Sequence, residues 1–233
     1  MDIKVIASSS KANCYIVNGI MFEAGLSIQK IKEALDFKLP EFCIISHSHG
    51  DHAKAVPQLI KLGVLCCMSK ETANAIGVKG HKVMIVEDGD TIEINETGIS
   101  QHTVVFFDTQ HDCTGSLGWV ILDTRTGEQL LFATDTYFIK YKFPALNYIM
   151  VECNYCKDII DKNVELGLMN KGLRDRIVSS HFELENVKEF LKANNNKDLK
   201  EVYLMHLSDL NSDENRMKSE VEKIVPGCIV KVC

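Results

Sequence analysis

The residues with the clearest chemical meaning lie in one short stretch, residues 46–52, which reads Ser-His-Ser-His-Gly-Asp-His. His47 and His49 are alternate residues, so in an extended loop both imidazoles can point the same way and bind one cation. Asp51 and His52 are adjacent and project differently, which suits a second ion nearby. The spacing therefore predicts a site for two metal ions rather than one tetrahedral zinc.

The segments around this loop indicate where the remaining ligands come from. The loop follows the apolar run 42–45 and precedes a helical pattern that becomes regular near Ala55, so we expect it to join a strand to a helix. His111, Asp135 and His206 each follow another apolar, strand-like run. A carboxylate can bridge two cations, and neutral imidazoles can complete their shells. These three residues are the expected further ligands.

Length and composition indicate one large domain over residues 1–233, because a chain that is 45% hydrophobic and 25% charged can build a sizeable core. No apolar run approaches the roughly 18 residues of a membrane helix, and the N-terminus soon becomes polar at residues 8–11. We therefore expect neither export nor membrane insertion. The nine cysteines are an odd number scattered over apolar segments and loops, which favours reduced thiols in the cytoplasm.

The formal net charge of −6 argues against a broad basic face that grips nucleic acid nonspecifically. Two bound divalent cations would offset that charge at the one place where a phosphate would sit. A phosphate-containing substrate thus remains compatible with an acidic chain.

The hydrophobic pattern is that of an α/β protein, in which two groups of strands are separated and followed by helices. Two packed sheets covered by helices are expected. The expected strands are residues 3–7, 14–17, 42–45, 83–86, 103–107, 117–122, 129–133, 148–151, 202–205 and 228–232. The expected helices are residues 27–35, 53–62, 185–193 and 212–224, the last with Ser212 as its capping residue.

The series His-x-His-x-Asp-His, followed by His111, Asp135 and His206, resembles the metallo-β-lactamase superfamily in order and spacing along nearly the whole chain. Within that superfamily it is most similar to the small bacterial exonuclease-like branch of the WalJ or YycJ type. Four further stretches carry the resemblance: Ser8-Ser9-Ser10-Lys11-Ala12-Asn13, Ala24-Gly25-Leu26-Ser27, Val151-Glu152-Cys153-Asn154-Tyr155 and His206-Leu207-Ser208.

The resemblance implies an αββα four-layer sandwich, the metallo-β-lactamase fold, with the metals at one edge between the two sheets. It assigns the ligands to two divalent ions, zinc first, with manganese or iron as alternatives. His47, His49 and His111 would hold the first ion, Asp51, His52 and His206 the second, and Asp135 would bridge them.

The implied activity is a phosphodiesterase, most specifically a nuclease acting on an accessible end or single strand of nucleic acid, or on a small phosphodiester. A hydroxide between the metals would attack phosphorus, since two zinc ions lower the pKa of water from ~15.7 toward ~7. Asp51 would orient that hydroxide. His181 stands where this branch has a histidine before its last ligand, and it would give a proton to the leaving oxygen.

Two other functions would use the same predicted metal ligands. The first is hydrolysis of a lactone or thioester, as in a lactonase or a glyoxalase II-like enzyme, and the second is noncatalytic nucleotide binding. Secreted β-lactamase activity is disfavoured because Asp135 stands where two-zinc lactamases place a cysteine. Glu23 is another departure, because the family has the shorter aspartate before Ala-Gly-Leu-Ser. Its contact with the metal loop is expected to be altered.

Several weaker signals receive plainer interpretations. Cys153 and Cys156 have Cys-x-x-Cys spacing, but no second pair follows at zinc-ribbon distance. His81 and His102 fall outside the motif series and are expected at the surface. A basic set is expected to be a solvated face, with phosphate contact as the alternative: Lys171, Arg174 and Arg176.

Overall fold

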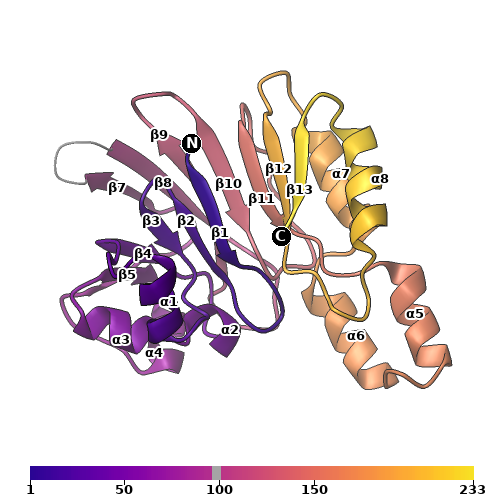
Figure 1. The fold of residues 1–233 in the computed structure, drawn as a ribbon, viewed down its shortest axis with the longest axis horizontal. Coiled ribbons are helices and arrows are strands. Elements are labelled where there is room, and N and C mark those ends of the chain that lie inside the picture. The colour runs from indigo at the N-terminus through magenta and orange to yellow at the C-terminus, as the bar shows by residue number, and fades with distance from the viewer. Residues whose placement is uncertain (96–100) are drawn as a thin grey trace. The chain divides into compact units, whose positions relative to one another are not determined.

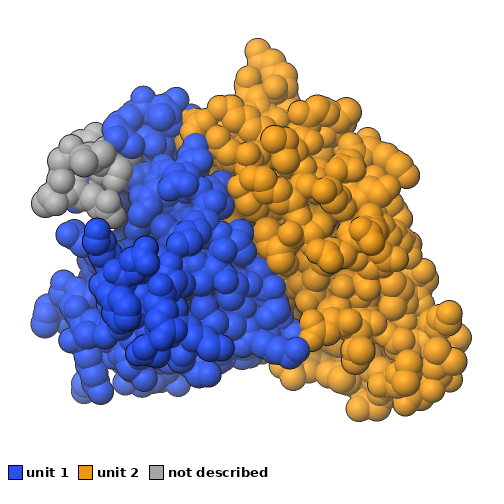
Figure 2. Space-filling view, in the orientation of Figure 1, with its two compact units in different colours: residues 1–108, 113–127 blue, residues 109–112, 128–233 orange. Residues whose placement is uncertain are grey.

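The computed structural model describes residues 1–95 and 101–233, which form a mixed α/β fold with two sheets and helices (Figure 1). The α/β class expected from the sequence is thus confirmed. The chain divides into two compact units, coloured separately in Figure 2. Unit 1 comprises Met1–Asp108 and Cys113–Gly127, and unit 2 comprises Thr109–Asp112 and Glu128–Cys233. The single domain over residues 1–233 stays a prediction.

Unit 1 contains a six-stranded sheet in the order β1 to β6. The first three strands are antiparallel, and β3 to β6 run parallel. Asn18 and Gly19 both have positive φ, as a tight two-residue hairpin between β2 and β3 requires. The strands are β1 (Ile3–Ala7), β2 (Cys14–Val17), β3 (Ile20–Phe22), β4 (Phe42–Ile44), β5 (Leu65–Met68) and β6 (Val83–Ile85).

Helices of unit 1 bury an apolar core against this sheet. Ile31, Leu59 and Ala73 come from three different helices and pack in one cluster with Met21 and Cys43 of the strands. Ser27 and Ser69 begin two of the helices by accepting a backbone N–H with their side chains, and these are the helices α1 and α4. The helices are α1 (Ile28–Ala34), α2 (Gly50–Ala53), α3 (Val56–Lys61) and α4 (Lys70–Ile76).

Unit 1 also contains three antiparallel strands, β7 (Thr91–Asn95), β8 (Gln101–Asp108) and β9 (Leu117–Asp123). Trp119 of β9 is fully buried, and its ring meets that of Phe22 edge to face, with centroids 5.1 Å apart. His102 of β8 is only 1% exposed, so its expected surface position is wrong. Its Nε2 lies 3.1 Å from Nδ2 of Asn18, because a histidine inside a sheet needs polar neighbours. His81 is exposed, as expected.

Unit 2 is built on four parallel strands in the order β10, β11, β12, β13. They are β10 (Gln129–Ala133), β11 (Tyr148–Glu152), β12 (Glu201–Met205) and β13 (Ile229–Val232). The helices are α5 (Lys157–Glu165), α6 (Lys171–Ser180), α7 (Leu184–Asn194) and α8 (Glu214–Ile224). Helix α7 packs on α8, α8 packs on β13, and α5 pairs with α6 (Figure 1).

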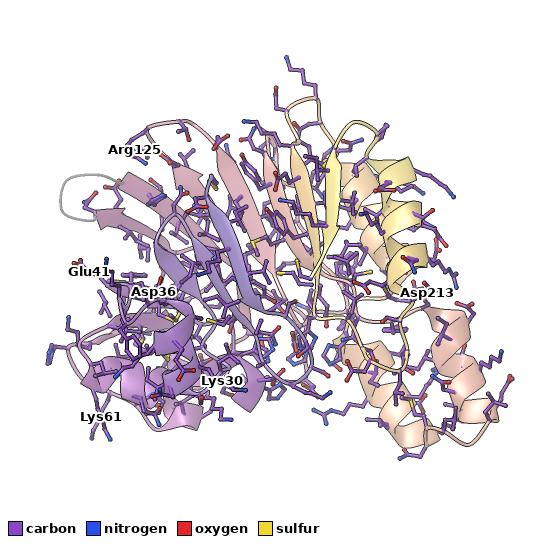
Figure 3. All side chains as sticks on the ribbon, viewed as in Figure 1. Lys30, Asp36, Glu41, Lys61, Arg125 and Asp213 are labelled. Carbon is purple, nitrogen blue, oxygen red and sulfur yellow. The ribbon has the colours of Figure 1, made fainter. Side chains whose placement is uncertain are left out.

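The structure adds and corrects several elements. Strands β3, β5 and β7 and helices α4, α5 and α6 were not among the expected segments. The cap of α8 is Asp213 rather than Ser212, and its carboxylate accepts the N–H of Arg216 (Figure 3). Among the described residues, every helix is too short or too polar to cross a bilayer.

Candidate metal centre

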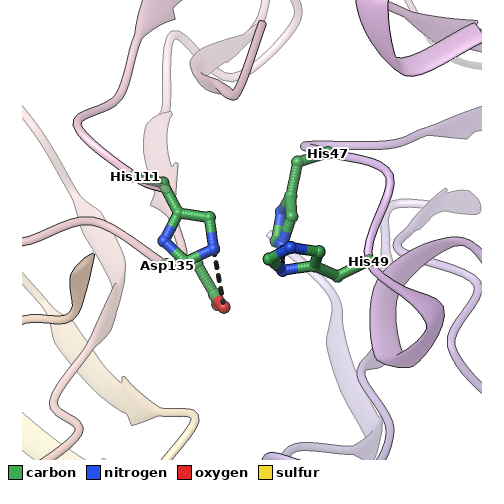
Figure 4. A group of neighbouring side chains, drawn as sticks. All are labelled: His47, His49, His111 and Asp135. Atoms are coloured by element: carbon green, nitrogen blue, oxygen red, sulfur yellow. Dashed lines mark hydrogen bonds and ion pairs between the residues drawn. The ribbon is translucent and has the colours of Figure 1, made fainter. Parts of the chain in front are cut away.

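Unit 1 presents the histidine loop at the carboxyl end of β4. His47 is 1% exposed, and its Nδ1 lies 2.8 Å from the Ser46 hydroxyl. Its Nε2 lies 3.1 Å from Nδ1 of His49, and the two rings approach edge to face (Figure 4). Nitrogens at about 2.0–2.1 Å from a tetrahedral zinc lie about 3.3 Å from each other. The spacing of this pair therefore fits two ligands of one ion.

The second half of the loop brings Asp51 next to His52. Oδ2 of Asp51 lies 3.2 Å from Nε2 of His52, and the His52 ring lies 4.2 Å, centroid to centroid, from that of His47. Asn13 contacts both residues, because its Nδ2 lies 3.1 Å from Nε2 of His52 and 3.4 Å from Oδ2 of Asp51. Asp51 and His52 therefore offer one oxygen and one nitrogen at a single point.

The buried carboxylate of Glu23 holds the predicted metal-binding loop, residues 46–52, in place. Glu23 follows β3 and is fully buried, with Oε1 accepting the N–H of Ser46 at 3.0 Å and Oε2 lying 3.3 Å from Nδ1 of His52. A carboxylate on the far nitrogen of a histidine fixes its ring and tautomer for a metal on the near nitrogen. The Glu23 side chain, one methylene longer than the aspartate of the family, thus still contacts residues 46–52. Burial raises the pKa of Glu23, while its contacts with His52 and Ser46 act in the opposite direction.

Gly25 is required by a close approach of two backbone segments. A Cβ at this position would lie 1.6 Å from the carbonyl oxygen of Asp51. The same oxygen accepts the N–H of Asn13 at 2.8 Å, and Ala24 donates its N–H to the carbonyl of His52 at 2.6 Å. The backbone of Asp51 and His52 is therefore fixed against the segment that follows β3.

We expect Gly25→Ala to lower the melting temperature of the protein and to impair metal binding, because its methyl group would displace the Asp51 backbone. The expected loss of stability is about 1–3 kcal/mol, the range for overpacking a tight site. Thermal unfolding and metal content measure the two effects. Gly50→Ala, in residues 46–52, is the matched control, since a Cβ there meets nothing within 4 Å. Equal behaviour of the two variants would contradict the structural role of Gly25.

Unit 2 presents its polar residues at the carboxyl ends of three adjacent parallel strands. Asp135 follows β10, Glu152 ends β11 and His206 follows β12. All three are buried, at 3%, 0% and 2% exposure. Asp135 and His206 have positive φ values, 28° and 55°, which non-glycine residues adopt at a cost. The strands thus gather these side chains at one edge of the sheet.

Asp135 lies between two imidazoles, one on each carboxylate oxygen. Oδ2 is 3.7 Å from Nε2 of His111 (Figure 4), and Oδ1 is 3.6 Å from Nε2 of His206. His111 donates from Nδ1 to the carbonyl of Ser180 at 2.8 Å, and its Nε2 also lies 3.1 Å from Oδ1 of Asp112. Oδ1 also accepts the Thr134 hydroxyl at 2.7 Å. The carboxylate is placed as a bridge between two cations would be.

Glu152 connects the histidines of this cluster. Oε1 lies 2.6 Å from Nδ1 of His181 and 3.1 Å from Nδ1 of His206. Oε2 accepts the backbone N–H groups of Thr136 and Phe182 at 3.0 and 3.1 Å. Because Nδ1 of each histidine faces Glu152, their Nε2 atoms face away from the glutamate.

The electrostatics of this pair follow from its burial and its charges. Burial lowers the pKa of His181, but the charge and hydrogen bond of Glu152 together with the charge of Asp135 raise the pKa overall. Burial raises the pKa of Glu152, but the charge of His181 and the hydrogen bonds from His181 and His206 together lower the pKa of this carboxyl overall. The two groups therefore form an ion pair, with the histidine side chain 18% exposed.

Each unit brings together part of the predicted site. His47, His49, Asp51 and His52 meet in unit 1, and His111, Asp135, His181 and His206 meet in unit 2. Asp135, Glu152, His181 and His206 can direct one ligand atom each to within 4.8 Å of one another. The assignment of the seven predicted ligands to two ions stays a prediction.

Sequence reasoning missed the role of three residues. Glu152 and Asn154 stood in the sequence only as part of a family-like stretch, and Asn13 likewise. The available signal for Glu152 was an acidic residue that ends an otherwise apolar strand. Asn154 supports His206, because its Nδ2 donates to the His206 carbonyl at 2.9 Å.

Comparison with known proteins identifies the fold. No protein-family model and no curated protein matches the chain. Solved structures match over nearly the whole length. Igni18, a metallo hydrolase from the archaeon Ignicoccus hospitalis, superposes with a TM-score of 0.68 at 15% identity, covering 99% of this chain and 94% of that one.

Two further structures are similar. Human tRNase Z, short form, has a TM-score of 0.60 at 12% identity and covers 100% of this chain and 96% of that one. A diphosphatase from the PhnP family has a TM-score of 0.63 at 11% identity, with 99% and 94% covered. The chain has the metallo-β-lactamase fold, as the motif resemblance predicts. The WalJ or YycJ branch stays a prediction.

Proposed function

We propose that this chain is a metal-dependent hydrolase of phosphodiesters, and that its substrate is a nucleic acid. The observation that carries the proposal is the Asp135 carboxylate, with one oxygen beside Nε2 of His111 and the other beside Nε2 of His206. A buried acid with a histidine on each oxygen is the arrangement that two cations need from a shared ligand. Both histidines have their Nδ1 tied to protein acceptors, as metal-binding histidines do.

The ligand assignment follows the order of the motif along the chain. In the proposal, one ion is held by His47, His49 and His111. The other ion is held by Asp51, His52 and His206, and Asp135 is shared. Nitrogen and carboxylate ligands in this number suit zinc, with manganese or iron as alternatives. The ions would be two per chain.

Bound ions would supply an acidic water and would neutralise charge on the phosphate oxygens. Side chains of the protein would orient the attacking water and protonate the leaving oxygen. The Asp51 side chain, which is 23% exposed, would hold and orient the attacking water. His181 has Nδ1 bound to Glu152, so its Nε2 can carry the proton that the leaving oxygen needs.

The similar structures favour a phosphate ester over a lactone or a thioester. One is named a tRNase and another a diphosphatase. The −6 net charge of the chain is no obstacle, because divalent ions would attract the phosphate locally. Cytoplasmic residence fits the same proposal, since six of the nine cysteines are buried and three are half-buried, and reduced thiols of this kind need no disulfide partner inside cells.

The test is a substrate panel on purified protein with and without metal. Bis-p-nitrophenyl phosphate, 5′-phosphorylated DNA, RNA, a lactone and a glutathione thioester are each assayed, then assayed again after chelation and after zinc or manganese is restored. We expect phosphodiester hydrolysis that chelation removes and metal restores. Turnover of only the lactone or thioester would overturn the proposal, and so would phosphodiester hydrolysis that survives complete metal removal.

A further inference from the structure

The segment that follows Asp135 has an unusual composition. The chain has 10 phenylalanines, six tyrosines and one tryptophan, and four of these aromatic residues lie within residues 137–143, which we call the aromatic-lysine segment. The same seven residues contain Lys140 and Lys142, while residues 136–147 contain no Asp or Glu. In a chain of net charge −6, this is a local concentration of rings and positive charge.

The segment is exposed in part and anchored in part. Phe138 is 52% exposed and Tyr137 is 40% exposed, which is high for large apolar rings, whereas Ile139 between these rings and the lysines is 6% exposed. The Thr136 hydroxyl donates to the carbonyl of Phe138 at 2.8 Å. Further along, the N–H of Phe143 donates to Oδ1 of Asn194 at 2.7 Å. A segment fixed in this way presents its rings with little entropy left to lose on binding.

A groove lies between the segment and helix α7. Its volume is about 270 Å³. The groove is lined by Phe138, Tyr141 and Lys142 on one side and by Phe182, Asn186 and Phe190 on the other. Aromatic walls with lysines at the rim suit a ligand that has flat apolar faces and an anionic backbone.

The charged side chains of this groove differ in their contacts from the basic side chains of helix α6. Arg174 and Arg176 of α6 bind Asp161 and Asp112, each at 2.7 Å, so those guanidinium groups already have acidic partners. Glu189 in the wall of the groove is paired with Lys192 at 2.6 Å. Lys140 lies over the ring of Tyr141, with its Nζ 4.8 Å from the centroid. Two lysines, Lys140 and Lys142, and one glutamate, Glu189, line the groove, so the lining carries a net positive charge.

We propose that the aromatic-lysine segment binds single-stranded nucleic acid. Bases would stack on Tyr137, Phe138 and Tyr141, and the lysines would contact the phosphates between them. The segment begins two residues after Asp135, so a strand held on it would lead to the carboxylate of the candidate metal centre. This inference rests on the proposed function and adds the form of its substrate. A double helix would be bound more weakly, because its bases are stacked on each other.

The experiment measures binding and hydrolysis separately on metal-loaded protein. Binding is followed by fluorescence anisotropy with a labelled oligothymidylate whose phosphorothioate linkages resist hydrolysis. We expect Phe138→Ala to weaken the affinity about tenfold, the usual size of one lost stacking contact. Lys142→Ala should weaken it at every salt concentration and reduce the salt slope by about one. Phe138→Trp should retain the affinity of the original protein, because it keeps a stacking face.

Matched controls come from residues far along the sequence. Phe37→Ala removes an aromatic ring that is 68% exposed, and Lys218→Ala removes an exposed lysine of α8. Both should leave oligonucleotide affinity unchanged. On a cleavable oligonucleotide, Phe138→Ala should raise KM, and the loss of kcat/KM should exceed the loss on bis-p-nitrophenyl phosphate, which has no stacked chain of bases.

The outcomes separate the two proposals. Unchanged oligonucleotide affinity in Phe138→Ala would overturn the role of the segment even if the protein hydrolyses phosphodiesters. A shift of Phe138→Ala in sedimentation velocity, without a change in oligonucleotide affinity, would make the groove an interface between copies and would also overturn it. Weakened oligonucleotide affinity in a protein that hydrolyses no phosphodiester would support the segment and refute the proposed function.

Discussion

Replacing Asp51 with alanine is expected to abolish hydrolysis while leaving the fold intact. The loss on the best substrate should be at least ~10³-fold, about 4 kcal/mol at 1.36 kcal/mol per tenfold. Its carboxylate faces His52 and Asn13 and is partly exposed, so its proposed work is at the site rather than in the core. The backbone bond from Asn13 to the Asp51 carbonyl survives the change. Steady-state kinetics measures the loss of hydrolysis, and circular dichroism measures whether the fold is retained.

Glu33→Ala is the control, because it removes an exposed carboxylate of the same charge from helix α1. It should keep full activity. If Asp51→Ala turned over substrate at the rate of the original protein, Asp51 would have no role in orienting water or in holding metal. A collapsed circular dichroism spectrum would instead make Asp51 a structural residue.

The second large effect is expected at His181, and it depends on the leaving group. If Nε2 of His181 gives a proton to the leaving oxygen, His181→Ala should slow hydrolysis of DNA or RNA by ~10²-fold or more, with metal content unchanged. The loss on bis-p-nitrophenyl phosphate should be much smaller, because p-nitrophenolate leaves without a proton. The ratio of the two losses is the measured quantity.

His81→Ala serves as the matched control, since His81 is exposed and makes no part of either cluster. Equal losses of His181→Ala on both substrates would point to binding or structure instead of proton transfer. Metal loss in the variant would make His181 a ligand, which is compatible with its place in the cluster whose ligand atoms lie within 4.8 Å of one another. No loss on either substrate would remove the residue from the mechanism.

Much of the candidate site was predictable because several of its metal-binding residue types lie close together in the sequence. Four of the predicted ligands fall within six residues, 47–52, and only a few histidines remain in the chain to join them. Asp135 and His206 were predictable from their place just after apolar strands, since parallel strands collect their carboxyl ends at one edge. The α/β class followed from the same runs of apolar residues.

The supporting carboxylates were harder to predict, for a physical reason. Glu23 and Glu152 are fully buried charges, and a sequence gives no sign of which acidic residue will have its desolvation offset by histidines and N–H groups. The positive φ values of Asp135 and His206 are likewise a tertiary effect, imposed on residues that do not prefer that conformation. His102 was misplaced because nothing local distinguishes a buried, hydrogen-bonded histidine from a surface one.

The central claim, a pair of metal ions that share Asp135, is tested most directly by the metal content of the protein. Purified chain is stripped with a chelator, reconstituted with zinc, freed of excess metal and measured by inductively coupled plasma mass spectrometry against protein concentration. The account predicts close to two ions per chain for the original sequence and fewer than two for Asp135→Ala. One ion or none in the reconstituted original protein would contradict it.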